Sequence, residues 1–466
     1  MKGARQTDFA YQAVYRYLTH LISELGADCR VRLPSLRQLS ERLNVSISTI
    51  QYAYSLLEKE GRVYSVAKSG YYALPMACTS VINSGSDLLE SLYSGARRPG
   101  MLVLSADEPA ALQPLDSPLL LLERELVRQY PRQPQLPPQP CGEHELRTAV
   151  AARYTTSASR YWHADDVYVG ADLRGALELL IGVLNLKGAA VLVESPCDWS
   201  ILRLLQAAEV RVIEVPVQAD GGLDLEILAH ALNDPSLRLA IVSSSLNMPH
   251  GSRIPEDNRR ATAQLLQQKG CWVLENDSYG ELGFEADNLR FRDVLDPDRL
   301  IVCSTFEKVM GPEAPYGYLL TRHLRSEFQR HFLLRAFRLS PIRQKAVARL
   351  YASGRFDQHL HVLRRLLKER KLSMSQAVQE RLGEALQIVD PQGGATLWAR
   401  CRRQVDMRRV FQRLLKQHVV IAPGELFSLQ GSYQQHLRLN HSFSGHHDLA
   451  AALALLGDAL RMEQLD

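Results

Sequence analysis

The sequence lacks the features that would anchor a chain in a membrane or cross-link it. No apolar run approaches the ~18 residues of a membrane-spanning helix, and the longest, Leu119–Leu122, is ended by Glu123 and Arg124. The amino end has no apolar signal core. The seven cysteines lie far apart, and none has CxxC spacing, which disfavours a zinc site or a disulfide framework. We therefore expect a cytoplasmic protein with reduced thiols, no metal and no membrane partner.

A strong net charge is also absent, and the small excess lies at one end of the chain. The formal charge of the 466 residues is +4, and residues 1–72 hold ten Lys and Arg against six Asp and Glu. A small domain that carries the whole positive excess suits a polyanionic partner. Because the chain is longer than one ordinary domain, we expect two or three folded units.

The first 76 residues predict a winged helix-turn-helix. Three helical patterns, the second and third preceded by a serine that can cap the helix, are followed by two short β-prone runs that form a hairpin. The helices are expected at Phe9–Leu25, Leu36–Leu43 and from Ser46 to Gly61, and the strands at Arg62–Val66 and Tyr71–Leu74. We expect a DNA-binding domain over residues 1–76, joined by a linker at 77–87 to a second domain at 88–466.

The third helix is the natural DNA-recognition element of such a domain. Its amino end enters the major groove in helix-turn-helix proteins, where hydroxyls and amides bind phosphate and a glutamine can recognise a base edge. The alternative is that these residues are ordinary solvated side chains. The candidate DNA contacts are Arg37 on the second helix, Ser46, Ser48, Thr49 and Gln51 on the third, and Lys68 on the wing.

The helix-turn-helix residues resemble one known family. The stretch from Arg32 to Gly61 reads RLPSLRQLSERLNVSISTIQYAYSLLEKEG and closely resembles the GntR family of bacterial regulators. The resemblance implies double-stranded DNA as the partner. That family usually has Arg or Lys where this chain has Ile47, and the loss removes a base or phosphate contact, although Ile47 could instead meet a thymine methyl group.

The remaining chain alternates helical and strand-like segments. This alternation over more than 200 residues predicts an α/β domain with a mainly parallel sheet, followed by a smaller α+β portion with a strand at Gly393–Trp398. Amphipathic helices such as Leu177–Leu184 and Arg259–Gln268 separate the strands. The strands are expected at Ala189–Val193, Val210–Val215, Leu239–Val242, Trp272–Leu274 and Leu300–Val302.

From about residue 86 onward the chain resembles the fold type I, aspartate aminotransferase-like domain. Together with a GntR-type head, it resembles the MocR subfamily of regulators. This resemblance implies a homodimer whose large domain binds pyridoxal phosphate and acts mainly as a sensor, without catalytic turnover. The landmarks that carry it are Cys141–Val150, Val193–Pro196, Gly251–Arg260, Glu275–Leu282, Ser304–Lys308, Ala422–Phe427 and Leu437–Asn440.

The resemblance also assigns the cofactor contacts, and most of them are changed. Lys308 stands at the Schiff-base position and Tyr279 at the position of the donor to the phenolic oxygen. Other usual contacts around the ring are replaced. Asn276 takes the place of the Asp at the pyridine nitrogen, Met248 that of the Asn of an Asn-Pro motif, and Asp198 or Trp199 that of the aromatic that covers the ring. Around the phosphate, Glu307 replaces a hydroxyl residue, Pro315 an Arg and Asp172 a Gly. A neutral amide cannot stabilise a pyridinium, and each close carboxylate costs phosphate binding on the order of 1 kcal/mol. We expect the binding of pyridoxal phosphate to be weakened or lost.

Two arginines suggest a different ligand. The resemblance gives Arg438 the substrate-carboxylate position, and Arg174 lies near the phosphate helix, so the two could bind a small anionic effector. Alternatively, Arg174 pairs with Asp172 or Glu178, and Lys308 bonds to Glu307, Asp277 or Tyr279.

Three functions follow from these residues. The first is a regulator with a degenerate or repurposed sensor domain. The second is a regulator that senses pyridoxal phosphate through Lys308. The third is an aminotransferase with an accessory DNA-binding head, which Asn276 and the lost phosphate contacts disfavour.

Overall fold

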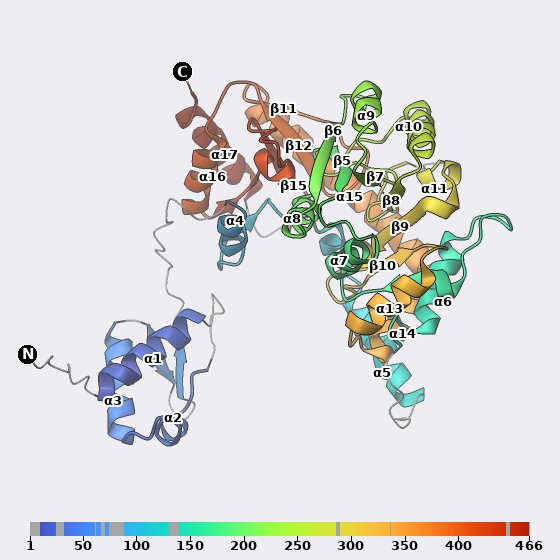
Figure 1. Ribbon diagram of the computed structural model, residues 1–466. Helices are drawn as coiled ribbons and strands as arrows, with labels where there is room; N and C mark the ends of the chain where they lie inside the picture. Colours follow the sequence, from blue (N-terminus) through green and yellow to red (C-terminus); the bar gives the residue numbers. More distant parts are fainter. Residues whose placement is uncertain are drawn as a thin grey trace, which may run out of the picture. The chain divides into compact units, whose positions relative to one another are not determined.

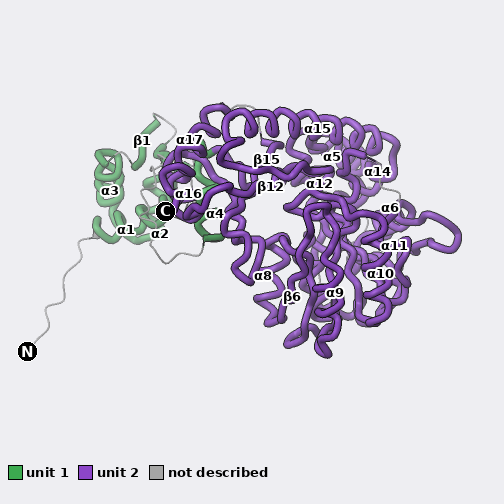
Figure 2. The backbone as a smooth tube through the Cα atoms, turned by 90° about the horizontal axis from the view of Figure 1, so that it is seen from above, with its two compact units in different colours: residues 1–101 green, residues 102–466 purple. Residues whose placement is uncertain are grey.

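The computed structural model of the chain contains two compact units, residues 1–101 and 102–466 (Figures 1 and 2). It describes residues 10–24, 32–60, 62–66, 70–73, 88–129, 139–285, 289–335, 337–443 and 448–465. The expected linker at 77–87 lies outside these residues, so the domain boundaries at 76 and 88 stay predictions. No helix within the described ranges combines the length and apolar character needed to cross a membrane.

The first unit contains the three helices and the hairpin expected from the sequence. They are α1 (Ala10–Glu24), α2 (Leu36–Leu43), α3 (Ile47–Lys59), β1 (Val63–Val66) and β2 (Gly70–Ala73), with α4 (Leu88–Ala96) later in the unit. β1 and β2 pair antiparallel. A small core of buried apolar residues, among them Leu18, Leu39, Ile50 and Leu57, joins the helices to the hairpin. The helical face that sequence periodicity marks as apolar is therefore the buried face.

Both predicted helix caps are present. Ser35 and Gln38 form a reciprocal capping box at the start of α2, and the Ser46 side chain accepts a hydrogen bond from the Thr49 amide at the start of α3. Asn44 ends α2 in the left-handed conformation, at φ 53°, which asparagine adopts more readily than most residues. These local signals fix the turn between α2 and α3.

The second unit is built on a seven-stranded sheet in the order β4-β10-β9-β8-β7-β5-β6. β10 runs antiparallel to both of its neighbours, and the other pairs are parallel. The sheet is thus mainly parallel, as predicted. Its strands are β4 (Val167–Val169), β5 (Ala190–Ser195), β6 (Arg211–Pro216), β7 (Leu237–Ser243), β8 (Trp272–Asn276), β9 (Leu300–Thr305) and β10 (Gly317–Leu320).

Helices cover both faces of this sheet, and its side chains alternate between two cores. Val191 and Val193 of β5 belong to one core, and Ala190 and Leu192 to the other, as the two-residue period of a strand buried on both faces requires. The core of Val191 includes residues of α7 (Leu173–Val183), α8 (Trp199–Ala207) and α13 (Arg325–Arg335). The core of Ala190 includes α5 (Asp116–Gln129), α6 (His144–Tyr154), α9 (Leu225–Ala231), α10 (Glu256–Lys269), α11 (Phe291–Val294), α12 (Glu307–Met310) and α14 (Pro341–Tyr351).

The 29-residue helix α15 (Gly354–Leu382) leads to a smaller α+β portion (Figure 1). Its sheet has the order β11-β12-β15-β14, and the strand expected at Gly393–Trp398 begins later, at Thr396. The elements are β11 (Leu386–Ile388), β12 (Thr396–Cys401), α16 (Met407–Lys416), β13 (Val419–Val420), β14 (Ala422–Pro423), β15 (His436–Asn440) and α17 (Leu449–Met462).

The first strand of this unit pairs with a strand near its carboxyl end. β3 (Leu102–Val103) pairs parallel with β13. The Leu104 amide donates to the Val420 carbonyl and the Leu104 carbonyl accepts from the Asn440 amide, each at 2.8 Å. The short helix η1 (Pro109–Leu112) follows. The connecting residues 105–108 therefore start beside β13 and β15.

Candidate functional site

The amino end of α3 presents polar side chains to solvent. Ser46, Ser48 and Gln51 are exposed, Thr49 is half-buried, and the Ser46 hydroxyl lies 2.9 Å from that of Ser48 and 2.7 Å from that of Thr49. Ile47 is exposed beside them. The backbone amides at a helix amino end carry partial positive charge, so this surface suits an anionic partner.

The sequence prediction placed the other DNA contacts on α2 and the wing. Arg37 is exposed on α2, whereas Lys68 lies outside the described residues. The prediction omitted Tyr52, which is 52% exposed next to Gln51 and contacts the ring of Tyr11 edge-on at 5.2 Å between centroids. Tyr52 lies on the exposed face of α3, away from the buried Ile50, Ala53 and Leu57.

Lys308, in the short helix α12 after β9, is engaged by a residue that the sequence analysis missed. Its Nζ lies 3.7 Å from the carboxylate of Asp107, donates a hydrogen bond to the Asp107 carbonyl and lies 5.3 Å from the centre of the Tyr279 ring. Of the partners expected for Lys308, Tyr279 is a neighbour through its ring, whereas the ion pair is made with Asp107 and not with Glu307 or Asp277.

Asp107 is the centre of a buried group that we call the Asp107 cluster, made of Asp107, Tyr279, Lys308, Arg438 and His441. The Tyr279 hydroxyl donates to Asp107 Oδ2, and a guanidinium nitrogen of Arg438 lies 3.7 Å from the same oxygen. Burial alone would raise the pKa of Asp107, but Lys308, Arg438 and the Tyr279 hydroxyl together keep it below its ordinary value. The carboxylate is thus ionised and compensated inside the protein.

Of the other members, Tyr279, Arg438 and His441 are buried and Lys308 is half-buried. Arg438, on β15, is only 2% exposed; its guanidinium lies 4.4 Å from the centre of the Trp199 ring and 5.0 Å from that of Phe427. Burial, with the nearby Asp107 charge, raises the pKa of Tyr279 well above its ordinary value, so the hydroxyl keeps its proton. Burial lowers the pKa of His441 to about 3, which leaves its ring neutral.

Asn276, at the end of β8, is used locally. Its side-chain oxygen accepts hydrogen bonds from the amide and hydroxyl of Ser278, at 3.2 and 2.7 Å. The carboxylates on either side of it face elsewhere: Glu275 and Asp277 lie 2.7 and 3.3 Å from Arg292. The amide thus anchors the turn that carries Tyr279.

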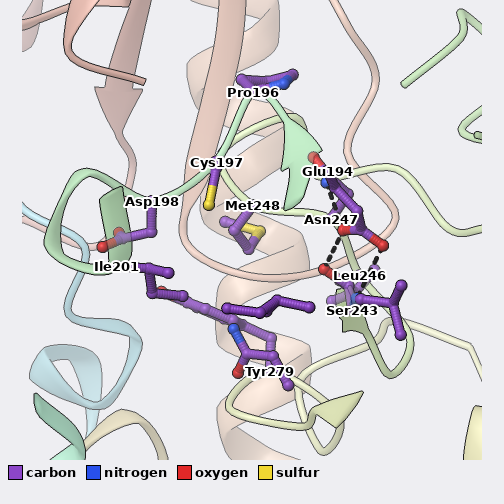
Figure 3. Close-up of a pocket in the computed structure, with 13 residues that line it drawn as sticks. Glu194, Pro196, Cys197, Asp198, Ile201, Ser243, Leu246, Asn247, Met248 and Tyr279 are labelled. Carbon is purple, nitrogen blue, oxygen red and sulfur yellow. Dashed lines mark hydrogen bonds between the residues drawn. The ribbon is translucent and has the colours of Figure 1, made fainter. Parts of the chain in front are cut away.

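A cavity of about 30 Å³ lies beside Asn276 and Tyr279, and Met248 and Asp198 also line it. Figure 3 shows Met248, Leu246, Ile201 and Tyr279 among the side chains around it. The cavity beside Asn276 is small and holds about one water molecule, whereas a surface hollow near Arg290 has a volume of about 490 Å³. Asn247, next to Met248, instead donates a 2.7 Å hydrogen bond to the buried Glu194.

The expected phosphate side is also occupied by protein groups. Asp172 caps α7 by accepting a 2.7 Å hydrogen bond from the Gly175 amide, so a carboxylate already lies at this helix amino end. α7 packs tightly on β10, since a Cβ on Gly317 would lie 2.3 Å from Leu173 Cα. Pro315, two residues before, supplies no cation.

The two candidate effector residues occupy different settings. Arg174 is exposed on α7, and Arg438 is buried in the Asp107 cluster. Glu178, one of the expected partners of Arg174, lies 3.9 Å from Arg335. Of the two arginines, Arg438 is the one that lies with Lys308 and Tyr279.

A winged helix-turn-helix followed by a fold type I domain defines a class of two-part proteins with a DNA-binding head and an aminotransferase-like body. The chain belongs to the aminotransferase class I and II family, whose model matches residues 133–452, and its residues 10–72 match the gntR family of bacterial regulatory proteins, which together give the MocR architecture. The family and the fold class predicted from the sequence are both confirmed.

Several relatives have the same organisation. The HTH-type transcriptional regulator YjiR of Escherichia coli is 28% identical, over 96% of this chain and 98% of that protein. The HTH-type pyridoxine biosynthesis transcriptional regulator PdxR of Corynebacterium glutamicum is 29% identical, over 76% of this chain and 74% of its own length. These regulator relatives and the gntR match support DNA binding by the head.

The solved structures that resemble the chain are aminotransferases. LysN, the alpha-aminoadipate aminotransferase of Thermus thermophilus, complexed with N-(5'-phosphopyridoxyl)-L-leucine, is 21% identical with a TM-score of 0.71, over 81% of this chain and 95% of LysN. At this identity the likeness shows the fold. Family membership supports pyridoxal phosphate binding as a general property of the fold.

Proposed function

We propose that this protein is a DNA-binding transcriptional regulator of the MocR type. Its head binds double-stranded DNA through α3, and its aminotransferase-like domain forms a homodimer and senses a small anionic effector without catalytic turnover. It acts in the cytoplasm. The observation that carries the proposal is the amino end of α3, where the Ser46 cap, exposed Ser48 and exposed Gln51 form a polar surface on the expected recognition helix.

The homodimer follows from what DNA recognition needs. A single helix-turn-helix covers one half-site, and two heads bind two half-sites that lie one helical turn or more apart. We assign the contact between copies to the large domain, as the resemblance to aminotransferases implies.

We also propose that pyridoxal phosphate binding is weakened or lost. The residues present fit this cofactor poorly: the Lys308 amine is paired with Asp107, the Tyr279 hydroxyl donates to Asp107, and the nearby cavity holds about one water. Asn276 offers a neutral amide where the resemblance requires an acid, and Pro315 no cation where it requires an arginine.

One alternative has a specific observation in its favour. Lys308 and Tyr279 keep their family positions and lie together, 5.3 Å from Nζ to the ring centre, which favours a regulator that senses pyridoxal phosphate through Lys308. Catalytic transamination is less supported, because Asn276 cannot stabilise the pyridinium that serves as its electron sink.

Gel retardation with the full-length chain tests the DNA-binding proposal. We expect the protein to retard DNA from the promoter region of its own gene at low salt, and its affinity to fall steeply as salt rises. Ile47→Asp, which adds a negative charge at the exposed start of α3, should abolish the shift. Arg381→Ala, at an exposed position of α15 in the other unit, is the control and should leave it unchanged. Absence of a shift at low salt with every DNA tested would overturn the proposal.

An absorbance titration with pyridoxal phosphate separates the two sensor hypotheses. We expect pyridoxal phosphate mixed with an equimolar amount of the protein to give the same absorbance spectrum as pyridoxal phosphate alone. A new band that disappears in Lys308→Ala would favour the alternative, and its loss on adding an amino acid, with release of product, would favour an aminotransferase.

A further inference from the structure

The Asp107 cluster contains one anion and more donors than that anion uses. Both cations lie 3.7 Å from Asp107 Oδ2, which is ion-pair range but longer than a charge-assisted hydrogen bond, about 2.8 Å. The side-chain contact to Oδ2 at hydrogen-bond distance is that of the Tyr279 hydroxyl. Asp107 therefore offsets one of the two positive charges and does not use all the hydrogen-bond donors of the site.

Unpartnered polar atoms mark the same place. Within the part of the chain that the structure describes, Asp107 Oδ1, Arg438 Nε and both ring nitrogens of His441 are buried without a hydrogen-bond partner. Asp107, Arg438 and His441 are at most 8% exposed. Buried polar groups are nearly always satisfied, and exceptions point to a missing ligand or water. Four such atoms in one cluster indicate a site that is built for more than its present contents.

The segment that brings Asp107 into the cluster is fastened at several points. The Arg438 guanidinium donates to the Ser105 carbonyl, and the Ser442 hydroxyl donates to the Glu108 carbonyl at 2.9 Å. Side chains on β15 and just after it thus form hydrogen bonds with the backbone on both sides of Asp107. A ligand that takes the guanidinium away from Ser105 also loosens the segment that carries Asp107.

We propose that Asp107 is an internal ligand whose carboxylate occupies a binding site for the carboxylate of a small molecule, and that an effector binds there by displacing Asp107. This rests on the proposed function in that the large domain senses a small anionic effector, and it places that effector at the Asp107 cluster. A carboxylate can bond bidentately to Arg438, which Asp107 does not. The rings of Trp199 and Phe427 beside the guanidinium favour a monoanion with an apolar body over a strongly hydrated dianion.

Displacement also explains how binding would be transmitted. An external ligand can shift the position of Asp107 only by binding one state better than the other. Its apparent affinity is its intrinsic affinity multiplied by the fraction of molecules in which Asp107 has left the site. Residues 105–108 connect β3, which pairs with β13, to η1, which packs against α12 and α15, so their release would loosen the connection between these elements. The internal carboxylate sets the concentration at which the effector acts.

Removal of the carboxylate and its replacement from solution test the proposal. We expect full-length Asp107→Ala to melt at a lower temperature than wild type in chloride. Sodium acetate at matched ionic strength should raise that melting temperature in a saturable way, with at least a tenfold higher affinity for the variant than for wild type. Neutral acetamide should have no effect. Asp357→Ala, which removes an exposed carboxylate 3.0 Å from Arg153, is the matched control and should gain no acetate response.

A double variant makes the outcome decisive. The double variant Asp107→Ala, Arg438→Met should lose the acetate response. If Asp107→Ala does not fold, Asp107→Asn, which keeps the shape of the side chain, takes its place, and its acetate response should lie between those expected for wild type and for Asp107→Ala. An acetate effect no larger than that of chloride, or one of equal size in wild type, overturns the proposal. DNA retardation by the same preparations separates the two ideas: acetate binding without any DNA shift would contradict the proposed function alone.

Discussion

The start of α3 and the Asp107 cluster use polar side chains in opposite ways. At the start of α3, Ser46 and Ser48 are exposed and Thr49 is half-buried. The Ser46 hydroxyl forms hydrogen bonds with those of Ser48 and Thr49, only two and three residues further along the chain. In the Asp107 cluster the partners of Asp107 are buried or, for Lys308, half-buried. They lie 172 residues away along the chain for Tyr279 and 201 for Lys308. The first site is complete within ten residues, whereas the second forms only when the large unit has folded.

This difference predicts different energies for the two sites. An exposed hydrogen bond competes with water and contributes about 1 kcal/mol. A buried charge that loses its partner costs several times more, because the remaining ion stays desolvated. Changes in the Asp107 cluster should therefore act on folding first, and changes at the start of α3 on DNA binding.

The largest effect is expected for Arg438→Met, which removes a guanidinium and leaves Asp107 with less compensation. The free energy of unfolding of the large unit should fall by about 3 kcal/mol. Arg461→Met is the control, because Arg461 pairs with Asp458 but is 72% exposed, and its loss should cost less than about 1 kcal/mol. Urea unfolding followed by tryptophan fluorescence measures this unit, since all four tryptophans lie after residue 101. Equal losses would contradict the contrast between buried and exposed pairs.

The same contrast explains what the sequence could predict. The caps Ser35 and Ser46 and the five parallel strands of the large sheet follow from local patterns, and the structure has them where they were expected. The antiparallel strand β10 and its edge partner β4 were missed. Each is only three or four residues long, and the two pair with each other although they lie far apart along the chain.

The candidate site was predicted only in part for the same reason. Lys308, Tyr279 and Arg438 were named from family positions, and the structure puts all three around one carboxylate. Asp107 was not named, since nothing in its neighbours Ala106 and Glu108 marks it as different from a surface acid. Its importance comes from burial and from partners far along the chain, which no local pattern contains.

Gln51 and Arg37 distinguish base recognition from phosphate contact on the head. Gln51→Ala should reduce discrimination between the best DNA site and a single-base variant by about 1–3 kcal/mol. Arg37→Ala should weaken binding to all sequences alike and lower the salt slope by about one. Competition with base-substituted DNA at several salt concentrations measures both. A uniform loss for Gln51→Ala would instead assign that side chain to the DNA backbone.

The cap of α3 gives a smaller, local effect. Ser46→Ala removes the acceptor for the Thr49 amide, 3.2 Å away, and should destabilise the helix start by about 1 kcal/mol. Amide hydrogen exchange in the first turn of α3 should then accelerate about fivefold. Ser48→Ala is the matched control, because Ser48 meets Ser46 through hydroxyls rather than capping the helix, and it should leave the exchange rates close to wild type.

The smallest expected effect is a difference in acid sensitivity between wild type and Asp107→Asn. The pKa of Asp107 in the folded protein lies below its ordinary value, since Lys308, Arg438 and Tyr279 outweigh the effect of burial. The stabilisation from this carboxylate is therefore present above the ordinary pKa of ~4 and is lost as the pH falls through the lower folded value. Asp107→Asn has no such proton to take up. Urea midpoints measured from pH 7 to pH 3 should fall more for wild type than for the variant, with the difference confined to the acid end. Parallel curves would mean that the carboxylate of Asp107 is not compensated in the way that its buried contacts indicate.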